Sequence, residues 1–446
     1  MARTKKTEQA PLTLEQIPAI PVEEQPYPLP KGWKWVRLGE AYQINPKNDV
    51  DDTTPVSFVP MEKIDPGMKG SFTFDVITWA KAKKGHTHFA NGDVAFAKIS
   101  PCFENGKSML VHGLKNGIGA GTTELIILRQ QNISQKFTFY IISSDNFIKK
   151  GTSTYSGTVG QQRISIDFVR KYPIPLPPID EQQRIVDRIE SLFAKLDEAR
   201  EKVESVIESF EKRKAAIIYN AIIGDITNKW RKNNKLYTTH WNIKTINELC
   251  TSLKYGTSKK SYKNGSVIVL RMGNLKHGEI DWSDLSFTND NDDIKNYSLE
   301  KGDVLFNRTN SPDLVGKTSI YRGEFPAIYA GYLIKLNYKK DEILGDFLNY
   351  TMNSVFAKKY CQSVKSDGVN QSNISAKKIG EFSISVPSLP EQQEIVRILD
   401  ELLAREEHIK ETAEKTLERI DLMKKAILAR AFRGELGTNV RPDNNQ

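Results

Sequence analysis

Two short stretches decide how this chain is organised: Glu181-Gln182-Gln183-Arg184-Ile185-Val186 and Glu391-Gln392-Gln393-Glu394-Ile395-Val396. They lie 210 residues apart, and the same spacing relates Gly92-Asp93-Val94-Ala95-Phe96 to Gly302-Asp303-Val304-Leu305-Phe306. Further upstream the spacing changes to 208, as between Trp33 and Trp241, which short insertions or deletions explain. A period this long in a chain of 446 residues indicates two copies of one domain and not a solenoid of short repeats.

Each of the two stretches opens a long segment without Pro or Gly. The first segment follows Pro178 and runs to Gly224, and the second follows Pro390 and runs to Gly434. Proline before the start and glycine at the end are typical of a helix. Apolar residues inside both segments recur in alternating steps of four and three, which predicts a heptad seam. The predicted seam residues are Ile185, Ile189, Leu192, Leu196, Val203, Phe210, Ile395, Leu399, Leu402, Ile409, Ile420 and Ile427.

A single helix cannot bury such a stripe by itself. The chain supplies two of matching period, so we expect them to pack as an antiparallel coiled coil around a pseudo-two-fold axis, with one globular domain at each end. About 43 residues at 1.5 Å each give a rod of roughly 64 Å. The alternative is that each helix only covers the core of its own domain.

The basic charge of the chain is confined to the globular parts. Residues 31–180 carry 19 basic and 13 acidic side chains, and residues 225–390 carry 24 and 17, whereas both helical segments are close to neutral. This distribution suggests two surfaces that face a polyanion, although ordinary solubilising charge would also produce it.

The globular parts are rich in β-branched and aliphatic runs bounded by turn residues, such as Val267-Ile268-Val269-Leu270, and short helices intervene, for example from Phe347 to Lys359. The predicted fold class is therefore α+β, with two sheet-rich domains separated by the two long helices. The predicted division is a flexible Pro-rich leader (1–30), a first globular domain (31–180), a first helix (181–224), a second globular domain (225–390), a second helix (391–437) and a tail (438–446).

A polar loop follows each Gly-Asp-Val strand, and cations stand at both of its ends. Lys98 and Lys107 bracket the first loop, and Arg308 and Lys317 bracket the second. The residues between them differ, although amides, hydroxyls and carboxylates of the kind that read base edges or hold phosphates occur in both. Solvated surface loops are the alternative. The candidate DNA contacts are Lys98, Ser100, Lys107, Gln161, Gln162 and Arg163 in the first domain and Arg271, Asn274, Arg308, Asn310, Lys317, Asn370 and Gln371 in the second.

Several classes of protein are disfavoured by the sequence. The longest aliphatic runs are far shorter than the roughly 18 apolar residues of a membrane span. Three widely separated cysteines without a secretory signal suit a reducing cytoplasm, and they have no metal spacing. Gly106-Lys107-Ser108 and Gly316-Lys317-Thr318 imitate the end of a phosphate loop but lack its first glycine. We find no adenosylmethionine loop, catalytic triad or nuclease motif, and we expect a chain that binds no metal or cofactor and is not itself an enzyme.

The duplicated helices end in Ala221-Ile222-Ile223-Gly224 and Ala431-Phe432-Arg433-Gly434, and a Gly-Asp-Val-x-Phe strand precedes each helix. With these features the chain resembles the specificity subunit of type I restriction-modification systems over nearly all of residues 31–437. The resemblance implies two target recognition domains, each reading one half of a bipartite, asymmetric DNA sequence, with the paired helices setting the distance between them.

The same resemblance implies partners and their cofactors. Two modification subunits would bind adenosylmethionine and methylate adenine, and restriction subunits would use ATP and Mg²⁺ to translocate and cleave DNA. One rival interpretation is a coiled-coil scaffold whose basic domains bind RNA or acidic proteins. Another is a methyltransferase or nuclease that acts by itself, which the missing cofactor loop argues against.

Overall fold

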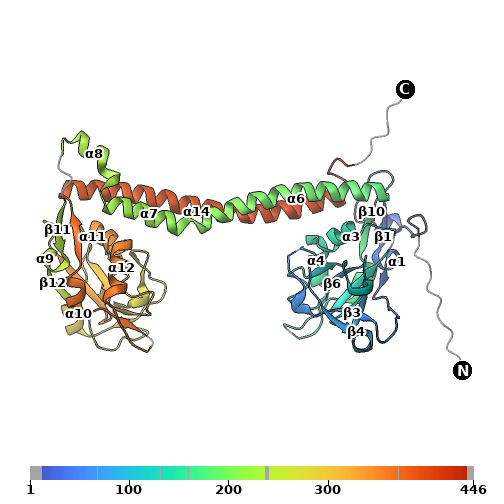
Figure 1. Cartoon of the computed structure of the whole chain (residues 1–446), viewed down its shortest axis with the longest axis horizontal. Helices are drawn as coiled ribbons and strands as arrows, with labels where there is room; N and C mark the ends of the chain where they lie inside the picture. The colour runs from blue at the N-terminus through green and yellow to red at the C-terminus, as the bar shows by residue number, and fades with distance from the viewer. Residues whose placement is uncertain are drawn as a thin grey trace. The chain divides into compact units, whose positions relative to one another are not determined.

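The computed structural model describes residues 13–67, 69–130, 132–158, 160–236, 241–369 and 371–438. It divides into two compact units (Figure 1). Unit 1 comprises residues 1–203 together with 415–446, and unit 2 comprises residues 204–414. Among the described residues, no helical segment combines the length and the hydrophobicity that a membrane span requires.

The globular part of unit 1 contains two four-stranded sheets. The first is antiparallel, and the second pairs its two central strands in parallel. The strands, in sheet order, are β2 (Gln43–Ile44), β9 (Leu125–Arg129), β6 (Val94–Ala97) and β7 (Ser108–Leu110), then β4 (Asp75–Thr78), β3 (Pro55–Val59), β8 (Ile118–Gly121) and β5 (Thr87–Ala90). Two capped helices, α3 (Gln135–Ile142) and α4 (Asp145–Thr152), follow β9.

Unit 2 repeats this arrangement, as the duplication predicts, except that its second sheet has three strands. Its two sheets have the orders β12 (Cys250–Tyr255), β21 (Leu333–Tyr338), β17 (Val304–Asn307) and β19 (Thr318–Ile320), then β16 (Phe287–Thr288), β13 (Val267–Leu270) and β20 (Ala327–Tyr329). The single helix expected from Phe347 to Lys359 is in fact two, α11 (Gly345–Met352) and α12 (Val355–Val364). The second begins anew because Ser354 caps it by accepting a hydrogen bond from the backbone of Ala357.

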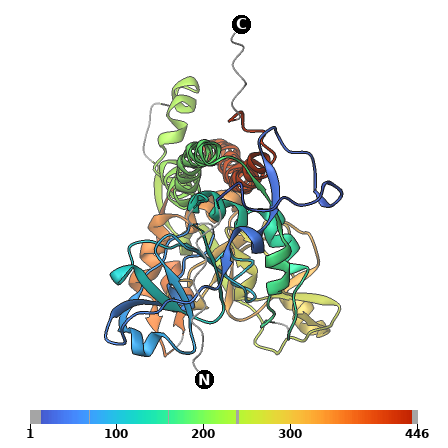
Figure 2. The same ribbon diagram turned by 90° about the vertical axis from the view of Figure 1, so that its right-hand side faces the viewer.

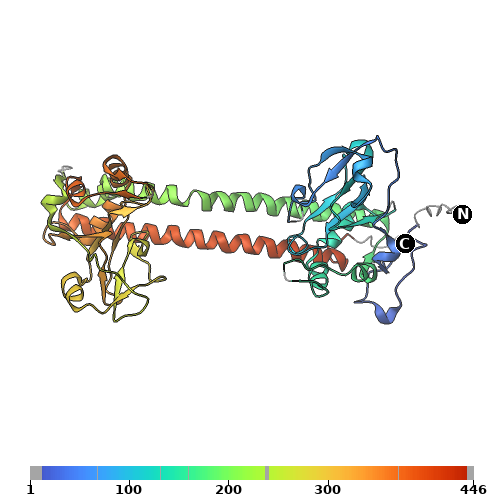
Figure 3. The same cartoon turned by 90° about the horizontal axis from the view of Figure 1, so that it is seen from below.

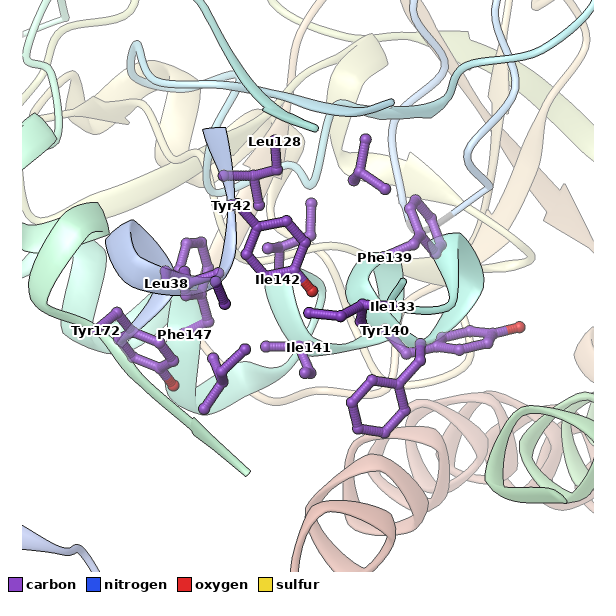
Figure 4. Close-up of a cluster of buried hydrophobic side chains, with 14 of the residues drawn as sticks. Leu38, Tyr42, Leu128, Ile133, Phe139, Tyr140, Ile141, Ile142, Phe147 and Tyr172 are labelled. Carbon is purple, nitrogen blue, oxygen red and sulfur yellow. The ribbon is translucent and has the colours of Figure 1, made fainter. Parts of the chain in front are cut away.

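Apolar side chains from α3 join those of the first sheet to form the main core of unit 1. Figure 4 shows Ile141, Ile142 and Phe139 gathered with Tyr42 and Leu128. Tyr140 extends this cluster toward the long helix, where its ring lies 5.9 Å from that of Phe193, centroid to centroid. The globular domain and the start of the helix therefore share one core.

The predicted long helices are α6 (Ile179–Glu208) with its continuation α7 (Phe210–Ile222), and α14 (Leu389–Phe432). In each unit, α14 lies antiparallel to its partner (Figure 3), and Figure 2 shows the helices end-on as neighbouring coils. In unit 1, Asp197 is paired with Lys424 and Arg200 with Asp421; in unit 2, Arg213 is paired with Glu406.

The helix seam differs in part from the predicted one. Buried residues include Ile185, Ile189, Phe210, Ile395, Leu399 and Ile420, while Leu192, Leu196, Val203, Leu402 and Ile427 are half-buried. The prediction for Ile409 is wrong, because its side chain is 43% exposed. Lys410 takes its place and lies 4.8 Å above the ring of Phe210, since a lysine stem covers an aromatic face while its charge stays near water.

The first glutamine of each Glu-Gln-Gln stretch joins the helix to its globular domain through hydrogen bonds. Gln392 is fully buried; its amide donates to the carbonyl oxygens of Glu342 (3.0 Å) and Pro387 (2.9 Å) and accepts from the backbone of Leu344 (2.8 Å). Gln182 repeats this arrangement, donating to the Pro177 carbonyl and accepting from the backbone of Ser134, each at 2.9 Å. These side chains satisfy backbone groups at the point where each helix begins.

The glutamates of the two stretches bind the segment that follows the antiparallel helix. Glu391 is buried and accepts hydrogen bonds from Thr227 (2.8 Å) and Arg231 (2.5 Å). Glu181 accepts a hydrogen bond from Thr438 at 2.8 Å. The glutamate near the start of each long helix is therefore hydrogen-bonded to a residue that follows the end of the other long helix.

The leader is not flexible over its described part, residues 13–30, so that prediction is corrected there; residues 1–12 lie outside the described residues. Ile17 and Ile20 are buried, the side chain of Lys34 donates to the carbonyl oxygens of Leu14 and Ile17, and the Tyr27 hydroxyl donates to that of Phe432 at 3.0 Å. Figure 2 shows this segment beside the end of α14. Its isolated apolar residues carry no periodic signal, which is why the sequence concealed the packing.

Candidate nucleic-acid interface

Both globular domains build the same small frame where the polar loop begins. In unit 1, Arg163 forms β-bridges to Ile99 and to Ser156. In unit 2, the same positions, each 210 residues later, form a three-stranded sheet of β18 (Thr309–Asn310), β23 (Ser372–Asn373) and β22 (Ser366–Asp367). The structure thus brings the loop after the Gly-Asp-Val strand next to the Gln161 or Gln371 segment in both domains.

The frame of unit 1 holds a charged pair. Arg163 donates two hydrogen bonds to the carboxylate of Glu124, at 2.8 and 2.9 Å. These bonds lower the pKa of Glu124 and raise that of Arg163. The pair fixes the guanidinium plane, and the Arg163 side chain remains 41% exposed at the surface. A DNA base would have to compete with Glu124 for this arginine.

The other candidates of unit 1 surround this pair unevenly. Lys98 is half-buried and accepts a backbone hydrogen bond from Ile164 at 3.0 Å, and Gln161 is exposed. Ser100 donates its hydroxyl to Glu104, and its backbone amide donates to the Gln162 carbonyl. The Lys107 ammonium, in contrast, donates to the Met61 carbonyl at 2.8 Å, and this contact fixes the loop.

The frame of unit 2 holds an arginine stacked on an aromatic ring. The Arg308 guanidinium carbon lies 4.9 Å from the centre of the Tyr255 ring. Its Nη2 donates to the Asn373 side-chain oxygen at 3.0 Å, and its Nε is buried without a hydrogen-bond partner. Tyr332, whose backbone oxygen accepts from the Arg308 amide, is 47% exposed. Arg308 is thus held flat by its neighbours at a surface that also exposes an aromatic side chain.

The remaining candidates of this loop differ in exposure. Asn310 is half-buried and accepts from the Ser311 amide, Gln371 is exposed, and Asn370 lies outside the described residues. The pKa of Lys317 is lowered, mainly by partial burial and to a smaller extent by the nearby charge of Lys276. A cation desolvated in this way gains most when an anion approaches it.

Two candidates of unit 2 serve the fold. Asn274 is only 3% exposed; its amide donates to the carbonyl oxygens of Asp281 and Asp284 and accepts from the Arg271 backbone, so the prediction of a DNA contact is wrong for it. Both amide hydrogens of this buried side chain are already donated, so it has no donor left for a base. Arg271 forms an ion pair with Asp284 at 3.1 Å.

Sequence reasoning missed four residues of the two frames: Glu124, Tyr255, Tyr332 and Asn373. Asn373 carried a signal, because it stands 210 residues after Arg163, a predicted contact. Glu124 and Tyr332 occupy equivalent places, since their backbone oxygens accept from Lys98 and Arg308 respectively. Their spacing of 208 differs from the 210 of the loop, which hides the match in the sequence.

Comparison with known proteins agrees with this geometry. The family model described as type I restriction modification DNA specificity domain matches residues 30–209 and again 239–419. The specificity subunit of the type I restriction enzyme EcoAI from Escherichia coli is 41% identical over 214 residues, which cover 47% of this chain and 36% of that protein. The EcoEI specificity subunit, also from Escherichia coli, is 42% identical over 182 residues, which cover 40% and 31%. The chain thus spans about a third of the length of these curated relatives.

Solved structures share the fold over most of the chain. The HsdS subunit from Thermoanaerobacter tengcongensis has a TM-score of 0.64 at 21% identity, covering 92% of this chain and 99% of that one. A chain solved in a study of type I restriction-modification complex assembly has a TM-score of 0.70 at 22% identity, with coverages of 92% and 100%. Because the family model matches both halves of the repeat, the chain belongs to the type I restriction modification DNA specificity family and carries two copies of its domain.

Proposed function

We propose that the chain is the DNA-reading subunit of a type I restriction-modification complex, in which each globular domain reads one half of a bipartite, asymmetric sequence. The observation that carries the proposal is a frame built twice with different side chains in it. The first frame contains the ion pair of Arg163 and Glu124. The second contains Arg308 with Asn373, and also the aromatic residues Tyr255 and Tyr332. Two similar readers with different contents suit two different half-sites.

The side chains of each frame match the chemistry of base edges. Arginine and lysine bind the O6 and N7 atoms of guanine or a phosphate, and asparagine and glutamine bind adenine. In the second domain, Arg308 offers its guanidinium edge, with Asn310 and Gln371 nearby. In the first domain, Lys98, Arg163 and Gln161 take these roles. Lys107 in the first domain and Asn274 in the second support the loops.

The paired helices would set the distance between the two readers and hold the partner subunits. Two modification subunits would bring adenosylmethionine and methylate adenine, and restriction subunits would bring ATP and Mg²⁺. The chain itself would contribute recognition and no catalytic group, and the complex would act on DNA in the cytoplasm.

The test is site-specific methylation by the complex that contains this chain and its modification partner. Arg308→Ala should lower methylation by about 5- to 160-fold, since a good bidentate arginine contact contributes about 1–3 kcal/mol of discrimination. Lys340→Ala, which removes an exposed charge elsewhere in the same domain, is the matched control. Unchanged methylation by the Arg308 variant would remove this residue from the interface.

The alternative of a scaffold with general polyanion-binding domains gives a different result. Such a scaffold would bind its target duplex no better than random-sequence duplex at physiological salt. Competition between the two duplexes for the full chain therefore separates the two functions.

A further inference from the structure

In each globular domain, a loop and a short helix face each other. In unit 1 the loop comprises residues 45–54 and the helix is α2 (Trp79–Ala82), which follows β4. In unit 2 the loop comprises residues 256–266 and the helix is α10 (Asn291–Tyr297), which follows β16. The two pairs are equivalent, because each loop leads into the strand that pairs in parallel with β8 or β20.

An ion pair joins loop to helix in both domains, but its polarity is reversed. In unit 1 the acid lies on the loop and the base follows the helix: Lys83 donates to Asp52 at 2.5 and 2.7 Å. In unit 2 the base lies on the loop, where Lys259 is 2.7 Å from Asp290 and 3.5 Å from Asp293. The same contact is thus made with exchanged charges.

In each domain, two further lysines lie next to the lysine of the ion pair, and they are therefore on the helix side in unit 1 and on the loop in unit 2. In unit 1, Lys81 and Lys84 are exposed, at and just after the helix; in unit 2, Lys260 and Lys263 are exposed on the loop. Within the described residues, none of these four has an ion-pair partner. The ion pair of each domain involves neither of its two additional lysines, so the charge of these lysines is available for a polyanion.

The lysines of unit 2 line a hollow on the surface of this domain. Lys259, Lys260, Tyr262 and Lys263 line it together with Asn264 and Asp290, and its volume is about 810 Å³. Tyr262 is 60% exposed at its edge. The loop starts at the frame, because the Gly331 oxygen accepts from Arg308 and the Gly331 amide donates to Thr257.

We propose that Lys260 and Lys263 in the second domain, and Lys81 and Lys84 in the first, bind the phosphate backbone of the DNA beside each half-site. This inference rests on the proposed function and extends it, since it assigns the non-specific part of the affinity to different segments in the two domains. Phosphate contacts position a protein on the duplex and carry no sequence information. The recognised bases then belong to the frames, and the lysine pairs add salt-dependent affinity.

The experiment measures binding of the full chain to a random-sequence duplex from 50 to 300 mM salt. Each lysine that neutralises a phosphate contributes about 0.9 to the slope of log affinity against log salt. Lys260→Gln with Lys263→Gln should therefore lower the slope by up to about 1.8 and the affinity at 0.1 M salt by up to about 60-fold. Lys81→Gln with Lys84→Gln should give a similar loss.

The control removes two exposed lysines from α8 (Asn228–Asn233) in the form of Lys229→Gln with Lys232→Gln, and its slope should match the wild type. Melting temperatures should stay unchanged in all three variants, because these side chains are exposed and unpaired. A slope change below about 0.5 in either test variant, or an equal change in the control, overturns the proposal. The first result would leave solubilising charge, or an acidic protein partner, as the role of these lysines.

The proposed function fails in a different way. If wild-type chain bound DNA with a steep salt slope that depended on the lysine pairs, but the complex methylated no defined sequence, recognition would be refuted and phosphate binding kept. If the lysine variants shifted the methylated sequence itself, the assignment of these residues to phosphates would be wrong.

Discussion

Replacing Gln392 by leucine should remove the hydrogen bonds that join the second globular domain to α14 and so lower the stability of unit 2. The amide makes three hydrogen bonds in a fully buried place, with the backbone groups of Leu344, Glu342 and Pro387. A typical hydrogen bond contributes about 1 kcal/mol net, and a buried group left without a partner costs about 1–3 kcal/mol. We expect the free energy of unfolding of unit 2 to fall by about 3 kcal/mol.

Thermal and urea unfolding of the full chain measure this loss. For a unit of this size, 3 kcal/mol corresponds to a fall of roughly 6–12 °C in melting temperature. Gln393→Leu is the matched control, because the neighbouring glutamine is exposed and should change stability by less than about 0.5 kcal/mol. Gln182→Leu should cost unit 1 about 2 kcal/mol, since two hydrogen bonds are lost. Equal effects at Gln392 and Gln393 would show that the buried amide of Gln392 does not stabilise unit 2.

Three further predictions concern stability. Ile17→Ala should lower the free energy of unfolding of unit 1 by about 2–4 kcal/mol in urea titration, because this leader residue is 1% exposed; a flexible leader would show no change. Arg213→Met should destabilise the helix pair by leaving the Glu406 carboxylate without its ion-pair partner, and the added change Glu406→Leu should restore melting; an Arg213→Met chain of wild-type stability would contradict this. Burial lowers the pKa of His88 below its ordinary 6.5, so the unfolded state takes up the proton first and the free energy of unfolding falls as the pH drops below 6.5. His88→Gln should therefore make the melting temperature less dependent on pH between pH 7 and 5. The control His408→Gln, at an exposed position, should not have this effect.

The repeat and the helices were predictable from the sequence because both depend on spacing. The Glu-Gln-Gln stretches begin in the first turn of α6 and of α14, and the strand Val267–Leu270 coincides with its predicted run. Periodicity identifies a helical face to within one residue, which is why Ile409 was placed on the seam in error while Lys410 occupies it.

The interface was predictable only in outline. Spacing identified the loops that meet, but not the use of each polar group: Asn274 and Lys107 bond to backbone inside the domain, although their residue types suit DNA. Partners from distant strands, such as Tyr255 beneath Arg308, have no local signal. A charge reversal between Asp52–Lys83 and Lys259–Asp290 becomes visible only when the two folds are superposed in register.

We infer that two linked domains each read their own half of one DNA site. A genome-wide map of methylated adenines in a host that carries this chain with its modification partner tests it most directly. We expect one asymmetric motif made of two short defined segments separated by a fixed number of unspecified bases. A continuous or palindromic motif, or two segments whose separation varies, would contradict it.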